Sequence, residues 1–135
     1  YHISDYAFNN SRKLPVDSVL VTCIGSIGNV AINKIECTTN QQINSIIPFE
    51  NTNSEYLAYA ILLKRDYLKF IANAPVVPII NKSQFSNIEV PVPPLSLQND
   101  FGERIEKIEA QKELVKQSIE HTEQLIAYTM DKYFN

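Results

Sequence analysis

The feature that most restricts the fold of this chain is an uninterrupted C-terminal stretch from Leu97 to about Tyr133. It contains a single glycine, Gly102, and no proline. Glycine and proline are the residues that most weaken a helix interior, so their near absence predicts one continuous helix. At 1.5 Å per residue that helix would be about 55 Å long. We expect Ser96 to be its N-cap, directly after a Pro-Pro-Leu sequence.

Apolar residues recur along this helix at alternating steps of four and three. The seam positions are Phe101, Ile105, Ile108, Val115, Ile119, Ile126 and Tyr133. A stripe of two positions in seven is typical of helices that pair as a coiled coil rather than dock on a globular core. We therefore expect a partner helix, either from a second copy or from another part of a longer chain. The alternative is a helix that folds back at a break near His121 and Thr122.

The preceding residues carry the marks of a small sheet. Val19–Ile24 and Asn29–Asn33 are short β-branched runs, and Gly25 and Gly28 stand at the ends of the connection between them. This pattern predicts a hairpin with a four-residue loop, because glycine adopts positive φ at little cost. Alternating polar and apolar residues in Gln42–Ile47 predict a third strand.

A helix is expected after the sheet. Asn51–Ser54 is a cluster of capping residues, and no glycine or proline occurs from Glu55 to about Ala72. Asn73 and Pro75 are expected to end this helix. Within the proline-rich segment 76–95, two short apolar pieces, Val77–Ile80 and Ile88–Val90, are expected to form edge strands or extended connectors. The fold class is therefore α+β: a small mixed or antiparallel sheet with a packed helix, followed by a long C-terminal helix that forms a coiled coil.

Composition sets limits on function without selecting one. The chain is 44% hydrophobic and 20% charged, which is typical of globular proteins, and no apolar run approaches the roughly 18 residues of a membrane span. We therefore expect a soluble, cytoplasmic protein. Residues 1–94 carry seven basic and seven acidic side chains, and residues 95–135 carry five and eight. A neutral head can still bind DNA through local basic patches.

Catalytic and metal chemistry have little support. A zinc site needs about four ligands, and Cys23 and Cys37 have only the distant His2 and His121 to join them. The Gly25–Gly28 loop lacks the Gly-Lys-Ser/Thr ending of a nucleotide-binding P-loop. We expect no metal, no cofactor and no catalytic residue; an enzymatic hypothesis would rest on Cys23 alone.

Polar residues in the expected connections suggest DNA contacts instead. Asparagine can read adenine through two hydrogen bonds, and lysine can reach guanine or a phosphate. The candidate DNA-contacting residues are Ser26, Asn29, Lys34, Asn81, Lys82 and Ser83. The alternative explanation is local, because asparagine and serine are common in turns, where they bond backbone groups.

The order of these segments resembles the target-recognition domain of type I restriction–modification specificity subunits. The segments that carry the resemblance are Val19–Thr22, Gly25–Gly28, Ala31–Ile32, Thr39–Gln42, Glu55–Tyr59, Ile80–Ser83, Ile88, and Val90–Leu95 followed by Gln98. No single motif is specific, but their order and spacing are, and the match covers nearly the whole chain.

The resemblance implies a role in recognition rather than a reaction. Specificity subunits of this kind carry two recognition domains, each for one half of a split DNA target, and two long antiparallel helices that set the spacing and dock methyltransferase subunits. The implied partners are double-stranded DNA, methyltransferase subunits and restriction subunits. The implied division is a partial target-recognition domain in residues 1–94 and a spacer or dimerisation helix in residues 95–135.

This sequence departs from the family pattern in two ways. Compared with that pattern, we expect it to start midway through a recognition domain and to contain one such domain and one long helix. We expect either the end of a longer subunit or a half-subunit that pairs with a copy of itself. The alternative function is an assembly module whose truncated head binds no DNA.

Overall fold

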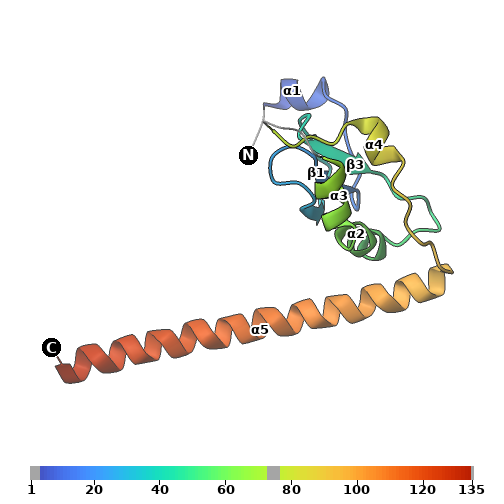
Figure 1. Cartoon of the computed structure of the whole chain (residues 1–135). Helices are drawn as coiled ribbons and strands as arrows, with labels where there is room; N and C mark the ends of the chain where they lie inside the picture. The colour runs from blue at the N-terminus through green and yellow to red at the C-terminus, as the bar shows by residue number, and fades with distance from the viewer. Residues whose placement is uncertain (1–3, 73–76, 135) are drawn as a thin grey trace. The chain divides into compact units, whose positions relative to one another are not determined.

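The computed structural model describes residues 4–72 and 77–134 and divides the chain into two compact units, Tyr1–Asn99 and Asp100–Asn135 (Figure 1). The elements in chain order are α1 (Asp5–Asn9), β1 (Val19–Thr22), β2 (Val30–Ile32), β3 (Ile43–Ile46), α2 (Ser54–Leu62), α3 (Arg65–Ile71), α4 (Lys82–Ser86) and α5 (Leu95–Phe134). The first unit holds the sheet and the short helices, and α5 supplies the second unit.

The sheet has the order β2-β1-β3, and both pairings are antiparallel. Val19 on the central strand lies opposite Ile32 on one side and Ile46 on the other. The hairpin, the third strand and the antiparallel form of the sheet are confirmed. The connection between β1 and β2 is longer than the expected four residues, because Cys23 has other partners. Its N–H donates to the carbonyl of Gln42 at 2.8 Å, and its carbonyl accepts from Ile80 at 2.9 Å.

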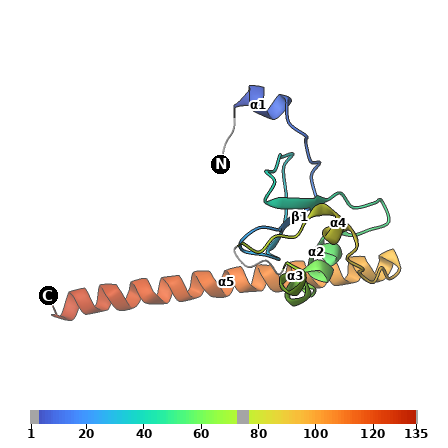
Figure 2. The same ribbon diagram turned by 45° about the horizontal axis from the view of Figure 1, so that its top comes forward.

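The core lies on one face of the sheet. Val19, Val21 and Cys23 alternate along the chain, and each is buried. In both views α2 and α3 lie against the sheet (Figures 1 and 2). The apolar side chains that these two helices contribute to the buried cluster include Ile61 from α2 and Leu68 from α3. The core therefore joins the central strand to both helices.

The expectation of one helix from Glu55 to Ala72 is wrong, because the segment forms two helices, α2 and α3. The start is as expected: Asn53 is the N-cap of α2, and its side chain accepts from the Tyr56 N–H. Near the break the Lys64 N–H donates to the carbonyl of Ile61, three residues back, so the last turn of α2 is tightened. No glycine or proline marks the break. The expected stop at Asn73 and Pro75 lies outside the described residues.

Two short helices are additional to the expected elements. The cap of α1 is Ser4, whose hydroxyl accepts from the Ala7 N–H. At α4 the Asn81 side chain accepts from the Gln84 N–H, and the Gln84 side chain accepts from the Asn81 N–H. This reciprocal pair is a capping box, which the Asn-x-x-Gln spacing signals in the sequence.

The long helix is confirmed. It runs without interruption over the 40 residues Leu95–Phe134, so a fold-back near His121 and Thr122 is wrong. At 1.5 Å per residue it is about 60 Å long. The expected N-cap on Ser96 is also wrong, because the helix begins one residue earlier. The carbonyl of Pro94 accepts the first helical hydrogen bonds, from Leu97 and Gln98.

One fully buried polar side chain, that of Gln98, fixes the first turn of α5 within the first unit. Its Oε1 accepts from the Asn53 N–H at 2.9 Å, and its Nε2 donates to the carbonyl of Pro93 at 2.7 Å. A longer contact of 3.4 Å reaches the carbonyl of Asn51. The side chain of Asn53 also donates to Asn99. A buried amide is tolerated when its polar atoms are paired in this way.

Candidate nucleic-acid interface

Two hollows in the first unit combine basic and polar side chains. The first, here the β3–α4 hollow, has a volume of about 430 Å³ and is lined by Arg12, Asn44, Ser45, Lys82 and Ser86 among others. The strand supplies the amide and one hydroxyl, and α4 supplies the lysine. Its polar groups suit hydrogen bonding to an anionic partner.

The second, here the β1–β2 turn hollow, has a volume of about 390 Å³. Ser26 and Asn29 come from the connection between β1 and β2, and Arg65 and Lys69 come from α3. Because Arg65 and Lys69 are four residues apart on one helix, they lie on the same side of α3. Pro78 closes the hollow.

Charge distinguishes these two hollows from the rest of the surface. Neither has a carboxylate among its described lining residues. The hollows that contain Lys34 and Lys64 are also lined by Glu55 and Glu89, respectively. A cation without a neighbouring carboxylate keeps its full attraction for a phosphate. The first unit therefore carries basic patches although its formal charge is balanced.

The two hollows are close along the chain. Pro78 lines the β1–β2 turn hollow and Lys82 lines the β3–α4 hollow. A fully extended chain spans at most about 3.6 Å per residue, so these two residues are within about 14 Å of each other. That separation is short enough for one nucleic-acid molecule to contact both hollows.

The β1–β2 turn holds Arg65 at two points. Gly28 has φ +79°, and a Cβ built on it would be 2.8 Å from Cγ of Arg65. Asn29 Oδ1 accepts from Nη2 of Arg65 at 2.8 Å. The turn is itself closed by Thr22, whose carbonyl accepts from the Gly28 N–H at 2.9 Å and whose hydroxyl oxygen accepts from the Asn29 N–H at 3.0 Å. The guanidinium is therefore bonded to a turn that is itself closed by hydrogen bonds.

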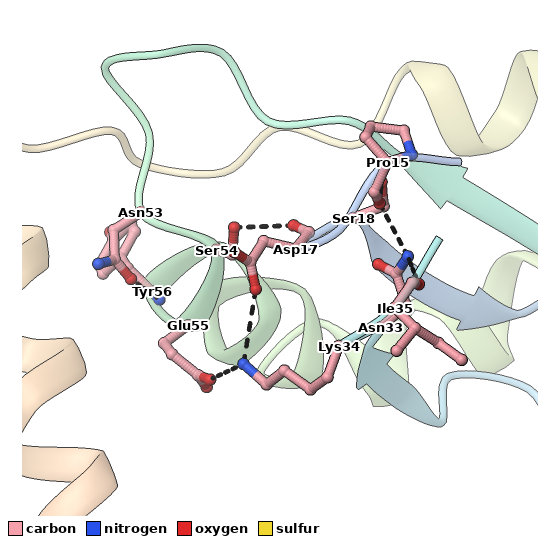
Figure 3. A network of polar contacts seen from close by, with 10 residues as sticks. All are labelled: Pro15, Asp17, Ser18, Asn33, Lys34, Ile35, Asn53, Ser54, Glu55 and Tyr56. Carbon is pink, nitrogen blue, oxygen red and sulfur yellow. Dashed lines mark hydrogen bonds and ion pairs between the residues drawn. The ribbon is translucent and has the colours of Figure 1, made fainter. Parts of the chain in front are cut away.

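Lys34 has different surroundings from the other candidates (Figure 3). Its Nζ lies 3.5 Å from Oε1 of Glu55 and 3.6 Å from Oδ1 of Asp17. The backbone carbonyl of Asp17 accepts from the Ser54 hydroxyl at 2.8 Å. Asp17 therefore also joins the start of α2 to the segment before β1. Asp17 has φ 64°, a conformation that aspartate tolerates better than most residues.

A neighbouring polar group in Figure 3 is structural as well. Asn33 Nδ2 donates to the carbonyls of Pro15 and Ile35, each at 2.8 Å, and the Ser18 hydroxyl donates to Pro15 at 2.8 Å. These bonds join the chain before β1 to the end of β2. They satisfy backbone carbonyls that no strand pairs, which explains why polar side chains are buried here.

The structure thus does not bring the six candidate DNA-contacting residues into one site. Ser26 and Asn29 lie in the β1–β2 turn hollow, Lys82 lies in the β3–α4 hollow, and Lys34 lies between two carboxylates. Asn81 caps α4, and Ser83 is exposed on that helix.

Sequence reasoning did not select Arg12, Arg65 and Lys69, which share the hollows with the candidates. Their charge was visible in the sequence, but the surroundings that leave it unmatched were not. None of the three forms an ion pair within the part of the chain that the structure describes.

All seven seam residues lie on α5. Ile108, Val115, Ile119 and Ile126 are between 49% and 59% exposed in this single chain. Two polar residues within the stripe bond their own helix: the hydroxyls of Thr122 and Thr129 donate to the carbonyls of Ser118 and Leu125. Leu114 and Leu125 are also exposed, so the apolar surface is wider than the predicted seam.

Residues 4–72 and 77–134 form neither a cluster of potential metal ligands nor a helix that could span a membrane. Within these residues no group of three or more His, Cys, Asp or Glu side chains is arranged to hold a metal ion. The helices formed by the same residues include none with the length and apolar character needed to span a bilayer.

Comparison with known proteins identifies relatives of the chain. The chain is 31% identical over 104 residues to the type I restriction enzyme HindI specificity subunit of Haemophilus influenzae, covering 75% of this chain and 23% of the relative. It is 38% identical over 84 residues to the MjaIX specificity subunit of Methanocaldococcus jannaschii, covering 61% of this chain and 19% of the relative. The chain therefore spans less than a quarter of the length of these relatives.

A solved structure shares the fold. It is a chain from a study of complex assembly and conformational transition in a type I restriction–modification system. The alignment has a TM-score of 0.69 and 18% sequence identity, and it covers 88% of this chain and 30% of that chain. The family model described as the type I restriction modification DNA specificity domain matches residues 1–124. The α+β head with its long helix, the two specificity subunits and the family model agree, and the chain belongs to the type I restriction–modification DNA specificity family.

Proposed function

We propose that this chain recognises one half of a split DNA target within a type I restriction–modification complex. The observation that carries the proposal is the presence of four basic side chains in two neighbouring hollows without a described carboxylate: Arg12, Lys82, Arg65 and Lys69. Phosphate contacts provide much of the affinity of DNA-binding proteins, and polar side chains beside them read the bases. Ser26, Asn81 and Ser83 remain proposed direct polar contacts, and Asn29 is proposed to contribute through Arg65, which its side chain holds.

Lys34 has a smaller part in this proposal than the other lysines. It would have to leave Asp17 and Glu55 to reach a phosphate, and the two carboxylates would repel the same phosphate. Its two contacts support a structural role at the junction of β2 and α2.

The chain is proposed to be a recognition component without catalytic residues of its own. The relatives, which are specificity subunits of type I restriction enzymes, support this assignment. Methylation and cleavage are proposed to belong to separate methyltransferase and restriction subunits. The cytoplasm, where such a complex would meet DNA, is the proposed location.

The seam on α5 is proposed to pair with an equivalent helix. In a preparation of these 135 residues the partner would be a second copy, because each chain has one long helix. The half-exposed apolar positions from Ile108 to Ile126 support pairing, and the internally bonded hydroxyls of Thr122 and Thr129 would enter the interface without losing a hydrogen bond.

The salt dependence of DNA binding tests the recognition role. We expect the logarithm of the binding constant to fall with the logarithm of salt concentration with a slope of about −2.7 if Arg12, Lys82 and Lys69 contact phosphates of duplex DNA, and of about −3.6 if Arg65 contacts one as well. Lys82→Ala and Lys69→Ala should each reduce the steepness of that slope by about 1. Lys64→Ala is the matched control, because Lys64 shares its hollow with Glu89.

A chain that self-associates without binding DNA would instead indicate an assembly module, the alternative function. Light scattering separates these cases when the chain is measured alone and with the methyltransferase subunit from its own locus. A dimer that takes up methyltransferase supports the complex. A monomer that ignores methyltransferase contradicts both helix pairing and docking.

A further inference from the structure

We propose that Arg65 reads a guanine of the DNA target and that Asn29 is the positioning residue that holds its guanidinium for this contact. The inference rests on the proposed DNA-recognition function and assigns a specificity-determining role within the β1–β2 turn hollow. It comes from the local contacts of Arg65, which the sequence pattern did not distinguish from any other exposed helical arginine.

The side chain of Arg65 is in contact with the β1–β2 turn at two points. The stem of Arg65 passes directly over Gly28, at a distance that leaves no room for a side chain there. The head is held by Asn29, through the 2.8 Å bond from Nη2 to Oδ1. Contacts at both ends lower the side-chain entropy that a DNA contact would otherwise cost.

The guanidinium of Arg65 retains most of its hydrogen-bond donors. A guanidinium has five N–H donors, and the bond to Asn29 uses one of them. Asn29 is the only hydrogen-bond partner of Arg65 among the described residues, and no described carboxylate forms an ion pair with it. Two remaining donors in one plane are what a bidentate contact to O6 and N7 of guanine needs.

A base contact and a phosphate contact make different demands on a side chain. A phosphate contact needs charge and reach, and Lys69 supplies a flexible point charge in the same hollow. A base contact needs a donor pair in a fixed plane, which the two-point attachment of Arg65 provides. The structure therefore favours base reading by Arg65 and phosphate binding by Lys69.

Asn29 is itself held by the central strand. Its backbone N–H donates to the Thr22 hydroxyl oxygen, and its carbonyl accepts from the Thr22 N–H, each at 3.0 Å. Thr22 is the last residue of the central strand β1. Asn29, which positions Arg65, is thus attached to the sheet at β1, the strand that is paired on both sides.

Selection from a library of random duplex DNA tests the proposal, using the full chain alone and assembled with its methyltransferase subunit. The wild type should select a motif that contains a guanine at one position. Arg65→Lys keeps the positive charge and the stem over Gly28 but lacks the planar fork, so it should lose the preference at that position and retain the rest of the motif. The loss expected for one bidentate contact is roughly 5- to 150-fold in discrimination.

Asn29→Ala leaves Arg65 in place and removes only its holder. It should weaken discrimination at the same position as Arg65→Lys, with little change in affinity for unrelated DNA. Lys69→Ala is the comparison variant, and it should weaken binding to all sequences alike. Circular dichroism of each variant checks that the fold is retained.

Three results would overturn the proposal. An unchanged motif in Arg65→Lys would show that Arg65 reads no base, while the recognition function would stand. A uniform loss of affinity with a shallower salt slope would assign Arg65 to a phosphate instead. If the wild type selects no motif in either form, the recognition function itself fails and the role of Arg65 fails with it.

Discussion

Replacing Gln98 by alanine should destabilise the first unit by about 3 kcal/mol, a value that follows from its contacts. Loss of each of the two good hydrogen bonds, to Asn53 and Pro93, would leave a partly buried backbone group unpaired, at roughly 2 kcal/mol apiece. The contact of 3.4 Å to Asn51 is too long to add much. Release of the ordered side chain returns about 1.5 kcal/mol, and the cavity left by the truncation costs a further fraction.

Urea titration followed by circular dichroism measures this change. With a slope of about 2 kcal/mol per molar urea, a loss of 3 kcal/mol lowers the unfolding midpoint by about 1.5 M. Hydrogen exchange gives a local measurement, because the Asn53 amide donates to Gln98 and should exchange faster in the variant. Gln98→Met separates the causes: it fills the space but cannot form the bonds, so most of the loss should remain.

Gln117→Ala is the matched control, since Gln117 is exposed on the same helix. It should change stability by less than about 0.5 kcal/mol. Two results together would contradict this prediction: a urea midpoint of Gln98→Ala equal to that of Gln117→Ala, and an unchanged exchange rate of the Asn53 amide. Such a result would mean that water replaces the lost hydrogen bonds without cost.

Three further predictions concern other parts of the chain. Ile119→Asp should break self-association, because it places an unpaired charge in the α5 interface at a cost of several kcal/mol. Gln117→Asp, on the same helix, should not break it. Light scattering measures the oligomeric mass, and an unchanged mass in Ile119→Asp would contradict the pairing. Burial raises the pKa of the Cys23 thiol, so its protonated form contributes stability that is fully present below the ordinary thiol pKa and decreases as the pH rises above that pKa. The half-buried Cys37 should react with iodoacetamide before the buried Cys23 does, and equal labelling of the native protein would show that the core at Cys23 is open to reagent. Asp17→Ala should lose about 1 kcal/mol in thermal unfolding because φ there is positive, while Asp17→Gly should change little; an equal loss in both would point to the Lys34 contact instead.

Elements whose signals are local could be predicted from the amino-acid sequence. The long helix follows from a stretch without proline, and its apolar seam follows from a repeat that needs no knowledge of the rest of the fold. The β1–β2 hairpin follows from two β-branched runs around a turn with glycines, and the start of α2 follows from a cluster of capping residues. In each case the residues that carry the signal are the residues that form the element.

Which side chains share a site depends on the packing of distant segments and could not be predicted from the sequence. Lys34 and Lys82 are equivalent in the sequence, yet one lies between two carboxylates and the other in a hollow without any described carboxylate. The break before α3 has no residue signal, and it coincides with the contact of Arg65 on Gly28. The burial of Gln98 depends on Asn53, 45 residues away. These properties depend on which distant segments pack together, and packing depends on the shape of the whole unit rather than on any local pattern.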